Sequence, residues 1–477
     1  MGNQKVAING AKWTSVASAI NTGASFIQLT ILAKLLEPEM FGIVAICNLI
    51  INFFHIFANL GFTNSIIYKQ ETDKKVLSSL FFVSLLLGIL IFFAMNAGAA
   101  SIAIFYKEPQ LKDLIHLTSV TFPMVTAGQI HQILLQKELR FRTLAFIDMA
   151  GSIIGVVITI LLAYNDYGAL SLLLGYLIST AIKTLCYFIC GSSIFKPLFH
   201  FNFWGIKEHL IFAMYNTGHG IVSFFGGNLE NIVIGRTIGI KELGFYTIAY
   251  QLAIFPISKL NPVILQVTSP IMAKIKDNEG LKRAFLKITD FISYCNFPLL
   301  AGLFATAVSI IPLIYGNGWE PTTELIKVLV FVGVCMCIIA PISPIIFSKN
   351  KPNIVFMLAI VSILVKLPLI YLGTHYFGLI GIAYSYLISA IIDTMLDFYY
   401  LNKLIGQFFK ELILNIYKPA LFCILMVACV LLYQNLVGIN GLINTSAQII
   451  IGGLVYIGLT LKYKISYKEL LELKKSM

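Results

Sequence analysis

Long apolar segments separated by short polar connections follow one another along the whole chain. Breaking the apolar windows at charged residues and at Pro/Gly clusters gives fourteen candidate helices. They cover approximately residues 13–35, 40–67, 77–105, 111–136, 143–164, 168–191, 210–233, 243–272, 286–315, 323–348, 353–375, 378–402, 416–437 and 442–461. A helix needs about 20 residues to cross a bilayer. The pattern therefore predicts an all-α integral membrane protein with about fourteen transmembrane helices.

Composition and charge agree with this fold class. Of the 477 residues, 58% are hydrophobic and 12% are charged, whereas soluble domains are roughly 45–50% apolar and about 25% charged. In a soluble protein the net charge of +12 would favour nucleic acid as a partner. Here, 25 of the 34 Lys and Arg residues lie in one set of alternate loops and four in the other. The positive-inside rule then predicts a multi-pass membrane protein with both termini in the cytoplasm and no nucleic-acid partner.

Two parts of the chain repeat each other. The segment Leu32–Gly42 matches Ile234–Gly244 at a shift of 202 residues. The segment Tyr176–Ser179 is identical to Tyr386–Ser389 at a shift of 210 residues. Identical non-apolar residues in register indicate an internal duplication of six helices.

Because six is an even number, the two copies enter the membrane in the same orientation. Parallel six-helix repeats around a central cavity are a transporter design, with the substrate near the repeat interface. We expect an N-lobe of helices 1–6 at residues 1–200 and a C-lobe of helices 7–12 at 201–405. A C-terminal helix pair and a cytoplasmic tail follow at 406–477.

Polar residues form stripes along single faces of several predicted helices. The first helix carries Ser18, Asn21, Ser25 and Gln28 at spacings of three and four residues. Such stripes must face protein or water, because lipid cannot satisfy their hydrogen bonds. They either hold helices together or line a shared cavity. The candidate ligand-binding residues from these stripes are Asn21, Gln28, Asn52, His55, Asn216 and His219.

Ionisable residues inside or at the edges of the predicted spans give the strongest indication of a site. Such charges are costly in a bilayer and usually line a cavity or an ion path. The candidate cations for binding an anionic group are Lys34, Lys183, Arg236, Lys259 and Lys366. The candidate ion-coupling carboxylates are Asp148, Glu230, Asp290, Asp393 and Asp397. Structural salt bridges and, for Lys34 and Arg236, long side chains that reach the membrane surface remain the alternatives.

Catalytic and cofactor motifs are absent from the sequence. It contains no GxSxG, P-loop, HExxH or nucleotide-binding Gly-rich motif. None of the eight cysteines belongs to a CxxC pair or lies near a His cluster with metal-ligand spacing. We expect no catalytic residue, no metal and no cofactor, and a protein that is not an enzyme.

Several segments resemble one known family. The segments Gly10–Trp13, Leu32–Gly42, Glu138–Phe141 and Glu230–Gly239 are similar to those of Wzx-type polysaccharide and O-antigen flippases. These belong to the multidrug/oligosaccharidyl-lipid/polysaccharide (MOP) exporter superfamily. The resemblance implies two six-helix bundles around a V-shaped cavity, plus two helices. The family often has Arg at the position of Lys34 and Asp at that of Glu230, and both differences keep the charge.

The resemblance also implies an activity and partners. Family members move undecaprenyl-pyrophosphate-linked oligosaccharide repeat units from the cytoplasmic to the periplasmic leaflet, for capsule, O-antigen or exopolysaccharide synthesis. Implied partners are the lipid bilayer and the polymerase and chain-length proteins of the pathway. The leading hypothesis is thus a flippase that works by alternating access and is coupled to an ion gradient. A cation-coupled multidrug exporter, an integral-membrane glycan polymerase and a structural scaffold remain alternatives.

Overall fold

The computed structural model describes residues 2–59, 66–67, 69–439 and 441–463, with the side chains of all but 2–9, 11, 203, 210–216 and 219. Of the described residues, 89% are helical and none lies in a β-strand. The predicted all-α fold class is confirmed.

The chain divides into two compact units, unit 1 (Met1–Gly244) and unit 2 (Phe245–Met477). The helices of unit 1 are α1 (Gly2–Leu35), α2 (Pro38–Asn59), α4 (Lys74–Tyr106), α5 (Gln110–Ser119), α6 (Thr121–Lys137), α7 (Phe141–Tyr164), α8 (Ala169–Gly191) and α9 (Phe203–Thr237). Helix α10 (Ile240–Lys274) begins in unit 1 and continues into unit 2. The other helices of unit 2 are α11 (Asn278–Tyr315), α12 (Glu320–Ile339), α13 (Ile342–Ser348), α14 (Pro352–Ile405), α15 (Phe409–Val437) and α16 (Leu442–Tyr463). The predicted lobe boundaries at 200/201 and 405/406 stay a prediction.

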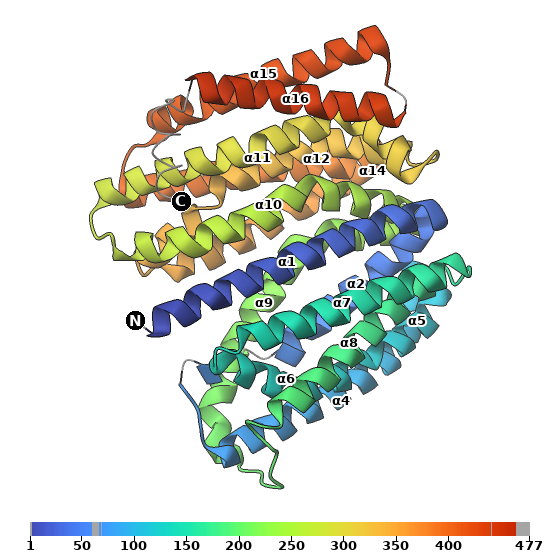
Figure 1. Ribbon diagram of the computed structural model, residues 1–477, viewed down its shortest axis with the longest axis vertical. Coiled ribbons are helices and arrows are strands. Elements are labelled where there is room, and N and C mark those ends of the chain that lie inside the picture. Colours follow the sequence, from blue (N-terminus) through green and yellow to red (C-terminus); the bar gives the residue numbers. More distant parts are fainter. Residues whose placement is uncertain (1, 60–65, 68, 440, 464–477) are drawn as a thin grey trace. The chain divides into compact units, whose positions relative to one another are not determined.

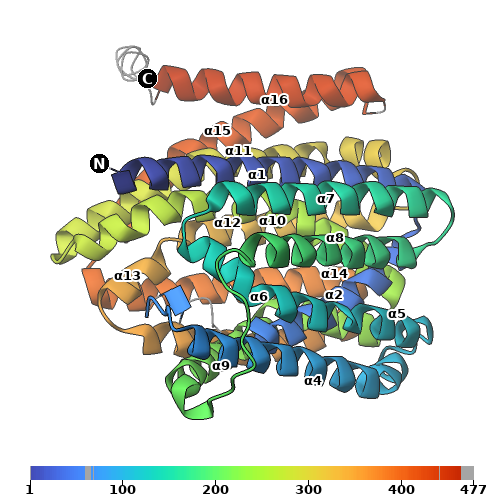
Figure 2. The same ribbon diagram turned by 60° about the horizontal axis from the view of Figure 1, so that its bottom comes forward.

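Unit 1 is built around α7 and α8. Helix α7 packs between α1 and α8, and α8 packs in turn against α6 (Figure 1). Helices α1, α7 and α8 run side by side, with α7 in the middle (Figure 2). Helices α7 and α8 approach each other closely at Thr159 and Gly175. A Cβ added to Gly175 would lie only 1.8 Å from Thr159 Oγ1, so a larger residue does not fit at this position.

Unit 2 is built around α11. This helix packs against α12, α15 and α16, and α15 and α16 pack against each other (Figure 1). Polar side chains fasten the C-terminal helix pair to α11. Ser309 Oγ and Gln434 Nε2 each donate to Gln448 Oε1 at 2.9 Å. The appended helix pair is thus part of unit 2.

The outer surfaces of the helices are apolar. Exposed side chains include Phe93 on α4, Leu364 on α14 and Leu454 on α16. Eleven described helices are long and apolar enough to cross a membrane. This arrangement is that of a multi-pass membrane protein, whose outer faces contact lipid. The count of fourteen spans and the cytoplasmic position of both termini stay predictions.

The helices extend beyond the predicted spans. Helix α1 begins at Gly2, α9 at Phe203 and α15 at Phe409, each several residues before the predicted start. Hydropathy detects only the apolar part of a helix, whereas backbone hydrogen bonding continues into polar turns outside the bilayer. The predicted span 111–136 is interrupted at Val120, between α5 and α6.

The backbone supports the internal duplication. Gly168 precedes α8 with φ 54° and ψ −133°, and Gly378 lies inside α14 with φ 58° and ψ −136°. The two glycines correspond at the shift of 210 residues. Residues with a side chain rarely adopt this conformation, so both copies use glycine at the same bend.

Candidate functional site

A polar pocket of about 310 Å³ lies within unit 1, between α1, α2, α7 and α8. Its lining includes Ser25 and Gln28 from α1, Asn48 from α2, and Tyr176 and Lys183 from α8. Two of these, Gln28 and Lys183, are predicted site residues. A pocket with one cation and several hydrogen-bonding groups inside apolar helices suits an anionic, polar ligand.

Lys183 is positioned by α7. Its Nζ donates to Ser152 Oγ at 3.1 Å. Its aliphatic part passes over Gly151, where an added Cβ would lie 2.5 Å from the Lys183 Cγ. The glycine therefore leaves the space that the lysine side chain occupies, and Ser152 holds its ammonium group at the pocket.

His55 extends the polar surface of this pocket. His55 Nε2 lies 3.3 Å from the hydroxyl of Tyr176, a residue that lines the pocket. The imidazole also packs against Phe122, with ring centroids 5.1 Å apart. The aromatic contact and the Tyr176 hydroxyl fix the ring from two sides.

Unit 2 contains the counterpart of the Lys183 contact. Ser362 Oγ donates to Asp393 Oδ2 at 2.7 Å. Ser152 corresponds to Ser362, and Lys183 to Asp393, at the shift of 210 residues. The duplication thus keeps the serine and exchanges the ammonium group for a carboxylate.

A buried cation lies near this carboxylate. Lys366 is 3% exposed, and its Nζ lies 4.3 Å from the ring centroid of Tyr386, a favourable cation–π distance. Its charge also interacts with that of Asp393. Asp397 lies one helical turn after Asp393, and the charges of the two carboxylates interact. These residues form a charged cluster inside unit 2.

The remaining predicted cations lie elsewhere. Arg236 Nη1 donates to the carbonyl oxygen of Phe105 at 2.5 Å, and the guanidinium carbon of Arg236 is 5.0 Å from the centre of the Phe105 ring. This contact ties the end of α9 to the end of α4. Lys34 and Lys259 are exposed, and neither lines the unit 1 pocket.

The remaining predicted carboxylates also differ in their surroundings. Asp148 Oδ1 accepts a hydrogen bond from the Tyr187 hydroxyl at 2.7 Å. Glu230 is 3% exposed, and Asp290 is half-buried. Neither Asp148 nor Glu230 lines the unit 1 pocket.

Several of the predicted polar residues also lie outside the unit 1 pocket. Asn52 is exposed and Asn21 is half-buried, and neither lines the pocket. Asn216 and His219 lie outside the side chains that the structure describes.

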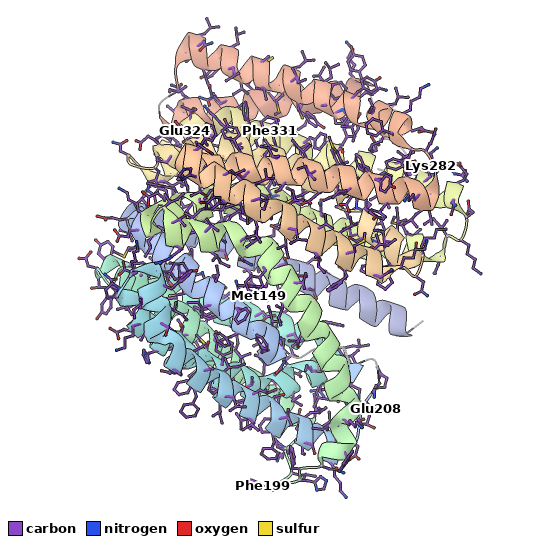
Figure 3. All side chains as sticks on the ribbon, turned by 180° about the vertical axis from the view of Figure 1, so that it is seen from behind. Met149, Phe199, Glu208, Lys282, Glu324 and Phe331 are labelled. Atoms are coloured by element: carbon purple, nitrogen blue, oxygen red, sulfur yellow. The ribbon has the colours of Figure 1, made fainter. Side chains whose placement is uncertain are left out.

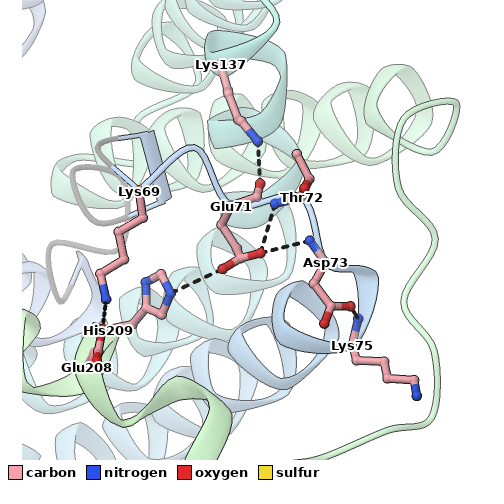
Figure 4. Close-up of polar contacts among 8 residues, drawn as sticks. All are labelled: Lys69, Glu71, Thr72, Asp73, Lys75, Lys137, Glu208 and His209. Atoms are coloured by element: carbon pink, nitrogen blue, oxygen red, sulfur yellow. Dashed lines mark hydrogen bonds and ion pairs between the residues drawn. The ribbon is translucent and has the colours of Figure 1, made fainter.

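A network of charged residues joins the start of α9 to the rest of unit 1 (Figure 4). Lys69 pairs with Glu208, and His209 Nε2 lies 3.8 Å from Glu71 Oε2. Lys137 of α6 donates to the backbone carbonyl of Glu71. Glu208 lies at the same end of unit 1 as Phe199 (Figure 3).

Two pKa values in this network are shifted. The hydrogen bond from Lys69 lowers the pKa of Glu208. Burial, reinforced by the charge of Lys69, lowers the pKa of His209, although Glu71 and Glu208 oppose the shift. At neutral pH the ion pair of Glu208 with Lys69 is therefore retained, and His209 is neutral.

Sequence reasoning missed the two serines that hold the central charges. Ser152 lies one turn after Asp148 and seven residues before Thr159 on α7, and Ser362 lies one turn before Lys366 on α14. Both serines therefore share a helix face with polar residues, although no predicted stripe included them. Their equivalence at the shift of 210 residues is the signal that identifies both. Among the described residues no group of three or more His, Cys, Asp or Glu side chains is placed to hold a metal ion.

Together, the apolar helices and the polar, charged pocket among them define a multi-pass membrane protein of the transporter class. A family model described as "Polysaccharide biosynthesis protein" matches residues 31–324. The chain is 30% identical over 421 residues to the lipopolysaccharide biosynthesis protein WzxC of Escherichia coli K12, covering 88% of this chain and 86% of that protein. The chain belongs to the polysaccharide biosynthesis protein family, in agreement with the resemblance predicted from its motifs.

Other relatives extend the comparison. The chain is 25% identical over 418 residues to the teichuronic acid biosynthesis protein TuaB of Bacillus subtilis, covering 87% of this chain and 86% of that protein. The solved structure of the lipid II flippase MurJ, in an inward closed conformation, is similar with a TM-score of 0.79 at 17% identity. It covers 96% of this chain and 99% of MurJ, so the two share a fold.

Proposed function

We propose that this chain is a flippase that moves undecaprenyl-pyrophosphate-linked oligosaccharide repeat units across the bacterial inner membrane. Family membership and the fold shared with a lipid II flippase support this function. The observation that carries the proposal is the pocket in unit 1, where Lys183 presents an ammonium group among neutral hydrogen-bonding side chains. That combination matches a ligand made of phosphates and sugars.

Within the pocket, the proposal assigns roles by chemistry. Lys183 binds a phosphate oxygen, because an ammonium group makes strong charge-assisted hydrogen bonds. Gln28, Asn48 and Tyr176 bind sugar hydroxyls. A volume of about 310 Å³ is at the low end for small-molecule pockets. The pocket therefore holds one part of the repeat unit during an alternating-access cycle.

The charged cluster of unit 2 is the proposed ion-coupling element. Asp393 receives a hydrogen bond from Ser362 and interacts with Lys366 and Asp397. Gain or loss of a cation at these carboxylates changes the charge inside the membrane, and such a change can bias one conformation over another. Asp148, Glu230 and Asp290 remain further candidates. The coupling ion is the one whose gradient across the membrane drives transport.

The proposal includes the cellular setting. The chain itself is a transporter without a catalytic step, and it delivers repeat units to the polymerase and chain-length proteins of a surface polysaccharide pathway. The cytoplasmic position of both termini follows from the 25 basic residues on one side.

The test measures lipid-linked oligosaccharide in cells that lack their own flippase and carry variants of this chain. Lys183→Gln should slow translocation strongly, so that repeat units accumulate on the cytoplasmic face while the protein level is unchanged. Lys418→Gln, which removes an exposed charge on α15, is the matched control. Unchanged translocation by Lys183→Gln would contradict the proposal. Efflux of cationic dyes without translocation would indicate the multidrug exporter instead.

A further inference from the structure

A second pocket, of about 820 Å³, lies at one end of unit 2. It is formed by the start of α11, the end of α14 and the start of α15, and Lys282 marks its place in Figure 3. These helix ends belong to the lysine-rich side of the membrane in the loop count of the sequence. The pocket therefore opens where helices meet the lipid headgroups.

One part of the pocket is cationic. Lys282 and Lys410 line it together with Glu411. Lys282 Nζ lies 2.8 Å from Glu411 Oε1, and the Lys282 side chain is 14% exposed. Since one lysine is matched by the glutamate, the pocket keeps a net positive charge. A third cation lies beside it, because Lys403 Nζ is 4.4 Å from the ring centre of the lining residue Tyr399.

The floor of the pocket is aromatic and rigid. Phe408 is 2% exposed. Its ring packs edge-to-face on Phe398 at 5.6 Å and on Phe285 at 5.2 Å between centroids. Such edge-to-face packing fixes ring orientation. The floor is thus preformed and does not depend on a ligand for its shape.

Another part of the lining is apolar and exposed. Met395, Phe409 and Ile413 line the pocket and are 65%, 59% and 52% exposed. In a membrane protein, exposed apolar residues next to interfacial lysines contact acyl chains. A ligand that fits both parts has an anionic head and apolar chains.

We propose that this pocket binds the phosphate headgroup of an anionic bilayer phospholipid, such as phosphatidylglycerol, from the lysine-rich leaflet. The phosphate lies at Lys282 and Lys410, and the acyl chains run along Met395, Phe409 and Ile413. Basic pockets between transmembrane helices on the cytoplasmic side bind anionic headgroups in this way. The bound lipid bridges α11, α14 and α15. This site is separate from the translocation pocket of unit 1.

The test uses the purified full-length protein in phosphatidylcholine nanodiscs, titrated with phosphatidylglycerol and followed by native mass spectrometry. Lys410→Gln should weaken binding of phosphatidylglycerol about five-fold, the effect expected for one lysine at a membrane surface. Lys282→Gln combined with Glu411→Gln removes a matched ion pair and keeps the net charge of the pocket, so it should weaken binding less than Lys410→Gln does. Lys418→Gln, on the same helix and outside the pocket lining, should bind as the unchanged protein does.

Three results would overturn the proposal. One is equal binding of phosphatidylglycerol and phosphatidylcholine. Another is equal binding of phosphatidylglycerol by Lys410→Gln and Lys418→Gln. The third is undecaprenyl phosphate binding at least ten-fold more tightly than phosphatidylglycerol with the same dependence on Lys410, which would assign the pocket to the lipid carrier. Because binding is measured without transport, a failure of the flippase proposal would leave this result unaffected.

Discussion

Replacing Gly378 by alanine measures how far the bend inside α14 depends on glycine. Gly378 has φ 58° and ψ −136°, a region that residues with a side chain rarely occupy. An added Cβ would meet no atom within 4 Å, so the cost is backbone strain alone. Strain of this kind costs about 1–3 kcal/mol. At about 2–4 °C per kcal/mol for a unit of this size, the melting temperature should fall by about 2–12 °C.

The assay is thermal unfolding of the purified full-length protein, followed by loss of the monodisperse peak in size-exclusion chromatography. Gly453→Ala is the matched control, because Gly453 lies within α16 and an added Cβ there also meets nothing within 4 Å. Since alanine favours helix over glycine by up to about 1 kcal/mol, this control should be unchanged or more stable. Equal melting temperatures for Gly378→Ala and Gly453→Ala would refute the reasoning.

Two further predictions concern the polar networks. Gln448→Ala should destabilise the attachment of α15 and α16 by about 1–3 kcal/mol, because Ser309 and Gln434 lose their shared acceptor. Amides of α16 should exchange faster in Gln448→Ala than in the control Ile449→Ala, which changes an outward-facing residue of the same helix. Equal exchange rates in the two variants would contradict the prediction. Because burial lowers the pKa of His209, the unfolded state binds more protons below about pH 6.5. Acidification to about pH 5 should therefore lower the protection of amides at the start of α9, measured as the exchange rate relative to the intrinsic amide rate at the same pH. His209→Asn should remove this loss of protection, and an unchanged loss would exclude His209 as its origin.

Much of the fold follows from the sequence because lipid leaves few alternatives. A chain inside a bilayer must satisfy its backbone hydrogen bonds internally, so apolar segments of sufficient length become helices. The break between predicted spans near residue 376 was predictable, since Gly378 interrupts α14. The interruption at Val120 was not predicted, although Thr118, Ser119, Thr121 and Pro123 surround it and a proline at the start of a helix commonly marks the end of the preceding one.

The candidate site was predictable in part. Polar spacing identified Gln28, and the intramembrane charge identified Lys183. Ser152 was not predicted, although Asp148, Ser152 and Thr159 recur at spacings of four and seven residues and therefore share one face of α7. Which residues meet depends on how α7 and α8 pack, and that depends on close approaches such as Gly151 beside Lys183. Arg236 is the opposite case: its charge made it a predicted site residue, but in the structure its side chain binds the carbonyl of Phe105.

The most direct test of the account is the rate at which lipid-linked oligosaccharide reaches the outer leaflet with Lys183→Gln, compared with Lys183→Arg. Losing a charged hydrogen bond costs about 1.5–3 kcal/mol, which corresponds to a rate about 10–150-fold lower. Lys183→Arg keeps the cation and should retain most of the activity. If Lys183→Gln translocates the oligosaccharide at the unchanged rate, with the protein at its normal level in the membrane, the central claim is contradicted.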